Sequence, residues 1–161
     1  MKDNIININL ETSTSPVISE SRGRDWVLYG DANGEWSNLY PQFIIDLYYS
    51  SSITAAIVNS TAEMIAGENL IIKDEDDRDL EARVKLQNFM NRANSNESLH
   101  EVIKKLSFDF KLQGGFALNV VWSKDRTQIA EVYHIDVSKV RCARPDEFGK
   151  TTGFYISADW T

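Results

Sequence analysis

The fold of this chain is decided by residues 98–143, which read SLHEVIKKLSFDFKLQGGFALNVVWSKDRTQIAEVYHIDVSKVRCA. Ser98 and Glu101 form a capping-box pattern, in which each side chain accepts a hydrogen bond from the other residue's backbone N–H. Apolar residues then recur at helical spacing until Gly114 and Gly115. We therefore expect a helix that starts after Ser98, with the two glycines giving a helix stop and a close backbone crossing.

The glycine pair leads into two alternating segments that predict a β-hairpin. One strand is expected over residues 116–122 and the other over residues 129–135, and Lys124–Thr127 forms the charged turn between them. Both faces of this hairpin are fairly apolar. We therefore expect both faces to be covered by other parts of the protein.

Three helices are expected before residue 98. Pro41 suits the first turn of a helix, where its missing N–H costs nothing. The serines at 50–52 supply an N-cap for the next helix, and Gly67 suits the left-handed position that follows its end. We expect helices over residues 41–49, 53–66 and 80–93, and a short strand over residues 70–72.

The second and third of these helices each carry an apolar stripe that we expect to face the core. The stripe of the second helix comprises Ile53, Ala56, Ile57, Met64 and Ile65. The stripe of the third helix comprises Leu80, Val84, Leu86, Phe89 and Met90. The second helix also carries small residues that allow a neighbouring helix to approach closely: Ala55, Ala56, Ser60 and Ala62.

Two further strands, expected over residues 140–143 and 154–158, complete an α+β fold with N-terminal helices packed on an antiparallel β-hairpin or meander. Residues 25–161 form one domain in this interpretation, and residues 1–24 form a flexible arm rich in Asn, Ser, Thr and Glu. The Ile-rich pattern over residues 5–10 predicts a strand where a partner edge is offered. Because the chain stops just after an apolar strand, we expect it to be a fragment of a longer protein.

The composition restricts the function classes. The 161 residues carry a formal net charge of −7 and show no dense Lys/Arg cluster, which argues against tight nucleic-acid binding. Cys142 is the single cysteine, so no internal disulfide is possible. No apolar run approaches the roughly 20 residues of a membrane helix, so we expect no membrane association.

The histidines and the acidic run, which could in principle bind a metal or act in catalysis, are better explained by structural roles. His100 and His134 match no zinc spacing; we expect His100 to be solvated and His134 to be satisfied by a neighbour. The acidic run at 74–79 lacks the glycine and distal glutamate of a calcium loop. No Ser/His/Asp order, nucleophile elbow or phosphate loop is present. We therefore expect no enzyme activity, no cofactor and no bound metal.

Four segments of the sequence together resemble portal proteins of tailed bacteriophages, and most closely those of the crAss-like phages. They run over residues 38–53, 56–70, 114–141 and 153–160, and include Asn38-Leu39-Tyr40-Pro41, Gly114-Gly115-Phe116, Val140-Arg141 and Asp159-Trp160. The resemblance covers about four-fifths of the chain. Its specificity lies in the order of the four segments, because no single motif is diagnostic.

The resemblance implies a ring of subunits, usually twelve, at one vertex of the capsid. Such a ring is assembled in the bacterial host cytoplasm and becomes part of the virion. It docks the capsid, the terminase and the tail or adaptor proteins, and it passes double-stranded DNA without sequence-specific binding. The matching part of portal subunits belongs to the outer wing, so contacts with DNA in the tunnel do not carry over to this chain.

Under this interpretation, certain residues are candidates for structural roles, namely Gly67, Ser98, Glu101, Gly114 and Gly115. Others are candidates for packing between subunits, namely Tyr40, Phe43, Tyr48, Trp122 and Tyr133. The alternative is a stand-alone α+β protein-interaction or adaptor module.

Overall fold

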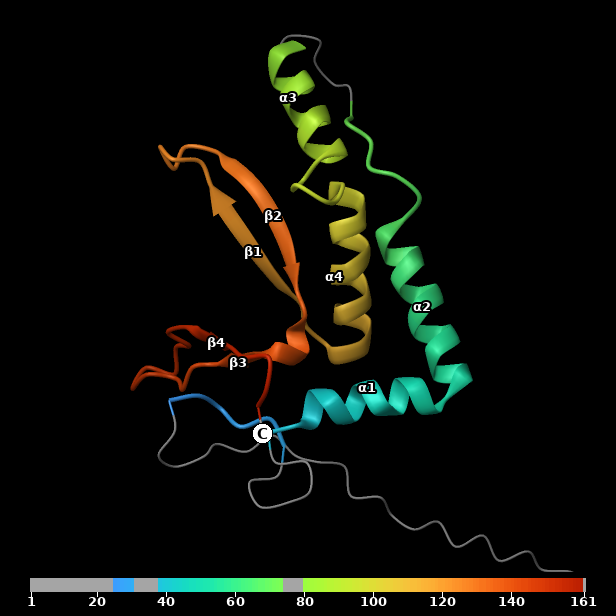
Figure 1. Ribbon diagram of the computed structural model, residues 1–161, viewed down its shortest axis with the longest axis vertical. Coiled ribbons are helices and arrows are strands. Elements are labelled where there is room, and N and C mark those ends of the chain that lie inside the picture. The colour runs from blue at the N-terminus through green and yellow to red at the C-terminus, as the bar shows by residue number, and fades with distance from the viewer. Residues whose placement is uncertain (1–24, 31–37, 74–79, 161) are drawn as a thin grey trace, which may run out of the picture.

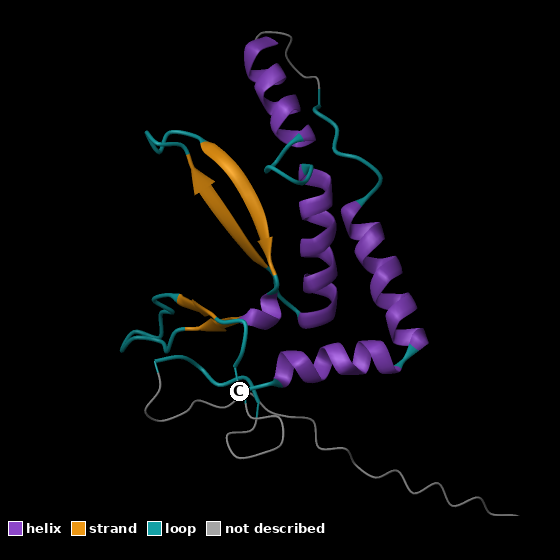
Figure 2. Ribbon diagram, in the orientation of Figure 1, coloured by secondary structure: helices purple, strands orange, loops and turns teal. Residues whose placement is uncertain are grey.

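The computed structural model describes residues 25–30, 38–73 and 80–160. These residues form an α+β fold, which confirms the predicted class (Figure 1) (Figure 2). The elements follow in the order α1 (Tyr40–Ser50), α2 (Ser52–Ala66), α3 (Leu80–Asn91), α4 (Leu99–Gln113), β1 (Ala117–Trp122), β2 (Ile129–Ile135), the 3₁₀ turn η1 (Val137–Lys139), β3 (Val140–Cys142) and β4 (Phe154–Ile156). The predicted arm at 1–24 and acidic turn at 74–79 lie outside the described residues.

Helix α4 is the central element of the fold. It contacts α1, α2, α3 and strand β2, and Figure 1 shows α2 on one side of α4 and the β1–β2 hairpin on the other. The sequence explains why α4 is central. Its apolar side chains lie on more than one side of the helix and pack against several neighbouring elements. Every other helix is therefore positioned relative to α4.

Both ends of α4 are closed as the sequence predicts. The Ser98 hydroxyl accepts a hydrogen bond from the Glu101 N–H at 3.3 Å, and the Glu101 carboxylate accepts one from the Ser98 N–H at 2.7 Å. At the other end Gly114 adopts the left-handed conformation (φ 77°, ψ 7°) and donates its N–H to the Phe110 carbonyl. A residue with a Cβ enters this conformation only at a cost, which explains the glycine.

The expected close backbone crossing at the glycine pair is wrong. A Cβ added to Gly114 or Gly115 would meet nothing within 4 Å. Gly67, the residue after α2, also has a positive φ of 71°, but its ψ of −175° lies outside the left-handed helical region. Gly114 and Gly67 are thus explained by backbone conformation and not by crowding.

The four strands pair two by two. Strands β1 and β2 are antiparallel, with Val120 opposite Val132, and β3 pairs with β4 in a second antiparallel sheet. In the described N-terminal segment, Trp26 forms an antiparallel bridge with Ala143, the residue after β3. The predicted strand at 70–72 is wrong, because those residues are in no strand.

The core joins α3, α4 and the hairpin. Its buried centre consists of Ala93, Val102 and Val132, with Phe89, Leu99, Leu106 and Val120 packed around it. The loop after α3 connects to the hairpin through its backbone and through Asn94: Val132 donates its N–H to the Ala93 carbonyl, and the Asn94 amide donates to the Val132 carbonyl at 2.8 Å. This polar loop therefore attaches the end of α3 to the hairpin.

Helix α2 packs through the side that carries small residues, and its stripe of large apolar residues does not face the core. Its buried residues are Val58, Ala62 and Ala66, which recur every four residues and therefore share one face. This face contacts α4. The large apolar residues of α2 remain exposed, because the small residues allow the closer helix–helix approach.

Another expectation about burial, that the apolar stripe of the third helix faces the core, is wrong for most of that stripe. In α3 only the C-terminal part reaches the core, and Leu80, Val84 and Leu86 are exposed. In the hairpin, Val120 and Val132 pack toward α4, while other large side chains of the same strands are exposed: Leu118, Trp122 and Ile129. The described residues therefore cover the hairpin only in part.

Candidate functional site

The exposed face of α2 carries a row of large apolar side chains, which we call the α2 stripe. Ile53 is 73% exposed and Met64 is 82% exposed, and Ile57 lies between them on the same face. Ile65 flanks the row and is also exposed. Several large exposed apolar side chains on one face are typical of a protein–protein contact, whereas single exposed apolar residues are ordinary.

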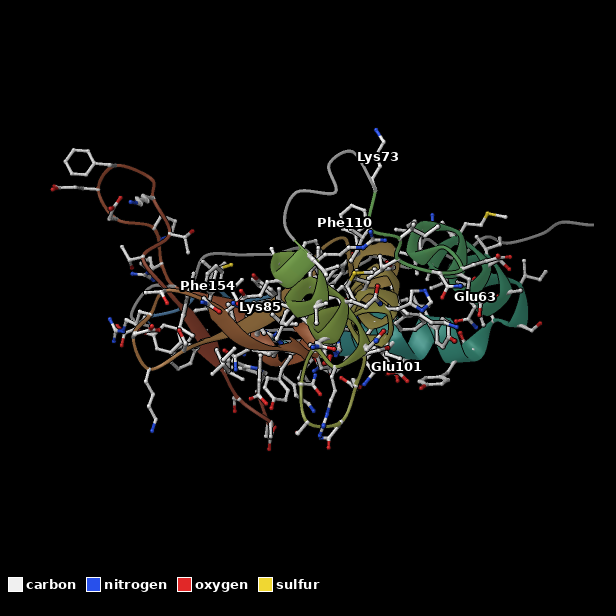
Figure 3. The ribbon with its side chains drawn as sticks, turned by 90° about the horizontal axis from the view of Figure 1, so that it is seen from above. Glu63, Lys73, Lys85, Glu101, Phe110 and Phe154 are labelled. Carbon is white, nitrogen blue, oxygen red and sulfur yellow. The ribbon has the colours of Figure 1, made fainter. Side chains whose placement is uncertain are left out.

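A second apolar surface lies on the other side of α4, around the base of the hairpin and β4. Phe110 and Phe116 pack edge to face with ring centroids 6.3 Å apart, and both are more than half exposed. Figure 3 labels Phe110 on α4 and Phe154 on β4. The exposed apolar residues of this hairpin-base surface are Phe110, Phe116, Leu118, Phe154 and Ile156.

Three of the five candidate subunit-packing residues lie on α1 and make contacts within the chain. The rings of Tyr40 and Phe43 are 6.2 Å apart, and Tyr48 packs edge to face on Phe108 of α4 at 5.5 Å. The Tyr48 hydroxyl also donates to the Asn59 side chain on α2. The neighbouring Tyr49, which was not a candidate, is far more exposed.

The other two candidates lie on the hairpin. Trp122, at the end of β1, is exposed, whereas Tyr133 is partly buried and donates its hydroxyl to Glu131 at 3.0 Å. The five candidates therefore do not form one cluster. Of the five, Trp122 presents the most exposed side chain.

The most elaborate polar cluster surrounds Arg141, which is fully buried. Its guanidinium donates to the Asn38 side chain at 2.9 Å and to the backbone carbonyls of Asn38, Ser138 and Val140. The group also lies over the rings of Tyr29 and Trp160, at 4.8 and 4.9 Å. Burial lowers the pKa of Arg141 to about 10, so the guanidinium remains charged at neutral pH.

Sequence reasoning assigned no role to Asn38 or Arg141. In the sequence, both residues were noted only because they lie in segments that resemble portal proteins. The structure brings three of those segments together, because the Asn38 amide also donates to the Trp160 carbonyl at 3.2 Å. Asn38 has a positive φ of 57°, a conformation that asparagine tolerates better than most residues.

Tyr29 and Cys142 lie beside this cluster. The Tyr29 hydroxyl donates to the Cys142 sulfur at 3.0 Å. Burial, together with this hydrogen bond, raises the pKa of Tyr29 to about 12. The phenol is therefore held in its neutral form, as a packing and hydrogen-bonding group.

Both histidines have partners within the chain. His134 contacts the Asp109 carboxylate at 2.7 Å, which agrees with the expectation of a neighbour that satisfies it. His100 was expected to be solvated, but its Nε2 lies 2.9 Å from the Gly67 carbonyl and links the start of α4 to the end of α2. A cavity of about 580 Å³ lies beside the His134–Asp109 pair and is lined by aromatic and charged residues of α1 and α4.

Within the described residues, no three His, Cys, Asp or Glu side chains are grouped as a metal site would need. In the same part of the chain, no helix is both long and apolar enough to span a membrane. Comparisons of the chain with protein-family models, curated proteins and solved structures find no match.

Proposed function

We propose that this chain is the N-terminal part of a portal subunit. It joins copies of itself in a ring at one vertex of a phage capsid, and the ring forms the channel for DNA packaging and ejection. The same ring docks the terminase and the tail. Under this proposal the chain acts through assembly and needs neither a catalytic residue nor a cofactor.

The observation that carries the proposal is the pair of exposed apolar surfaces on opposite sides of α4. The α2 stripe lies on one side and the hairpin-base surface on the other (Figure 1). A closed ring requires a heterologous contact, in which one surface of each subunit meets a different surface of the next. Two separate apolar surfaces on one subunit meet this requirement.

Two further features support the proposal. Three of the four segments that resemble portal proteins meet around Arg141, so residues that carry the resemblance form one packed cluster. The net charge of −7 is also compatible with a part of the subunit that does not grip DNA, because few cations are available to hold phosphates.

The test is to purify the full-length gene product and image it by negative-stain electron microscopy. The expected result is rings with a central channel, with a mass in solution that corresponds to about twelve subunits. A stable monodisperse monomer across a range of protein concentrations and salt would overturn the proposal. That outcome would favour the interaction-module alternative.

A further inference from the structure

The cavity of about 580 Å³ beside the His134–Asp109 pair, which we call the α1–α4 cavity, has the size of an ordinary small-molecule site. It lies where α1, the C-terminal part of α4 and the end of β2 meet. Figure 1 shows α1 lying across the lower end of α4, next to η1. The cavity includes no residue of the α2 stripe or of the hairpin-base surface, so the proposed ring contacts leave it without a role.

Part of the cavity lining is aromatic. The ring of Tyr48 packs edge to face on Phe108 at 5.5 Å and on Tyr49 at 5.1 Å, measured between ring centroids. Tyr49 is 79% exposed, so its ring is open to a ligand. Aromatic rings offer apolar area, and their faces attract cations through the ring quadrupole.

His134 contributes a hydrogen-bond acceptor to the lining. Asp109 Oδ2 accepts a hydrogen bond from the Val137 N–H at 3.2 Å and lies 2.7 Å from His134 Nε2. Because this oxygen accepts, Nε2 donates to it, and in the neutral ring the lone pair is on Nδ1. Nδ1 has no hydrogen-bond partner among the described residues, and solvent reaches it, since the buried side-chain atoms without a partner there belong to Trp26 and Gln42.

Gln113 and Asp136 add two more acceptors to the lining. The Gln113 side-chain amide donates to the Pro41 carbonyl at 3.0 Å, and its Oε1 has no hydrogen-bond partner in the described part of the chain. Asp136 uses Oδ1 to accept from the Ser138 N–H, while its Oδ2 lies 3.7 Å from the Lys139 ammonium, beyond hydrogen-bond distance. An amide oxygen and a carboxylate oxygen are therefore available to a donor.

The two lysines of the lining already have partners. Lys104 contacts Glu63 at 3.2 Å and Lys105 contacts Glu97, and neither glutamate lines the cavity. The positive charges of the lining are thus compensated from outside it. The available oxygens and the lone pair of His134 all accept hydrogen bonds, and the aromatic faces also favour positive charge.

We propose that the α1–α4 cavity binds a small organic cation, namely a primary amine attached to an aromatic or apolar body. The ammonium group donates to acceptors of the lining, among them His134 Nδ1 and the Asp136 carboxylate, and the body packs against Tyr49. An ammonium group has three N–H donors and no acceptor, which complements these groups. The inference concerns one chain and does not depend on ring formation.

The test compares three probes of nearly equal shape on the full chain: phenethylamine, phenethyl alcohol and hydrocinnamate. Saturation-transfer NMR observes the ligand and measures each dissociation constant at neutral pH. We expect phenethylamine to bind with a Kd on the order of 1 mM, as a ligand of this size allows. It should bind roughly tenfold more tightly than the alcohol, because hydrogen bonds from charged groups are stronger.

Variants show whether the α1–α4 cavity is the site. Tyr49→Ala removes an exposed ring, and Asp136→Asn removes a charge but keeps an oxygen that can cap η1, so both variants should fold. Each should weaken phenethylamine binding roughly three- to fivefold. The matched controls are Phe148→Ala, at an 86% exposed ring in the β3–β4 loop, and Glu147→Gln beside it, and both should leave binding unchanged.

Each other outcome overturns the inference. Equal binding of the amine and the alcohol would show that the site selects an apolar body and not a cation. Tighter binding of hydrocinnamate would show that Lys104 and Lys105 determine the ligand. No binding of any probe, or binding that Tyr49→Ala and Asp136→Asn leave unchanged, would exclude the cavity as the site. None of these results bears on whether the full-length protein forms rings.

Discussion

At the scale of single residues, Arg141 connects more parts of the chain than any other residue discussed above. Its hydrogen bonds go to neutral oxygens and its flat faces meet two aromatic rings, so the buried charge is balanced by dipoles and π-systems. Only the planar fork of arginine makes these contacts together.

Replacement of this residue, Arg141→Met, is expected to lower the free energy of unfolding by about 3 kcal/mol or more. The reason is that several buried carbonyl oxygens lose their donor, and each such loss costs roughly 1–3 kcal/mol. Urea unfolding measures the effect. Arg141→Lys should also destabilise the protein, because an ammonium group lacks the fork.

The matched control for this prediction is Arg144→Met, at an exposed arginine three residues away. A surface change of this kind is expected to remain within about 0.5 kcal/mol of the wild type. Equal effects at positions 141 and 144 would contradict the role assigned to the buried guanidinium.

Glu101 gives a pH prediction. The Ser98 backbone N–H, followed by the Ser98 side chain, lowers the pKa of the Glu101 carboxyl below its usual value. A carboxyl whose folded-state pKa is lowered stabilises the protein above its unfolded pKa, and this stabilisation is lost as the pH falls through the lowered value. Stability should therefore decrease as the pH falls below the ordinary glutamate pKa of about 4.3 and through the lowered value.

The Glu101→Gln variant should lose this part of the pH dependence, because glutamine does not titrate. Thermal unfolding at a series of pH values compares its slope with that of the wild type. Glu68→Gln, at an exposed carboxylate outside the capping box, is the control and should retain the wild-type slope. Parallel curves for the wild type and Glu101→Gln would show that the capping box adds no pH-dependent stability.

At the scale of elements, the end of α4 and the loop after α3 determine how the helices connect to the strands. Gly114 turns α4 toward β1, and Asn94 attaches the loop after α3 to β2. Asn94 is also an acceptor for the N–H groups of Asn96 and Glu97, so one buried side chain holds the loop and the hairpin together. The hairpin thus depends on the helices as much as on its own turn.

The glycine pair after α4 provides an internally controlled prediction. Gly114→Ala should reduce stability by about 1 kcal/mol, because alanine resists the left-handed conformation even where space is open. Gly115 has no positive φ, so Gly115→Ala should be neutral or stabilising by a few tenths of a kcal/mol. Chemical unfolding of both variants checks the difference, and equal values would contradict the assigned cap.

At the scale of the whole molecule, α2 buries small apolar side chains and leaves its large apolar side chains exposed. Val58 is 6% exposed, whereas Met64 of the same helix is 82% exposed. Burial of a large apolar side chain contributes roughly 1.5–3 kcal/mol, so covering the α2 stripe would supply substantial assembly energy. This surface is where the proposed ring is most easily disrupted.

The double variant Ile57→Glu and Met64→Glu is therefore expected to abolish rings in the full-length protein without unfolding the subunit. Carboxylates in an apolar contact lose solvation without gaining a partner, whereas on a free surface they remain hydrated. Light scattering measures the assembly state and urea unfolding measures subunit stability. Lys124→Glu, in the exposed hairpin turn, is the control and should still form rings.

Rings formed normally by the double variant would exclude the α2 stripe as a subunit contact. The hairpin-base surface would then be the next surface to test.

The sequence by itself determined the local structure. The capping box, the glycine stop, the hairpin turn and the second hairpin strand at 129–135 were all predicted, because each depends on interactions between residues a few positions apart. The α+β class followed from the same local patterns. Predictions failed at residues 70–72, where an apolar run found no strand partner.

Only the tertiary structure decided which surfaces are buried and what meets around Arg141. The pattern of α2 contains two apolar faces, one large and one small, and the choice between them depends on the shape of α4. The contacts of Arg141 with Asn38 and Trp160 join residues far apart in the chain. Such contacts depend on how complete elements fit together, and no local pattern encodes that fit.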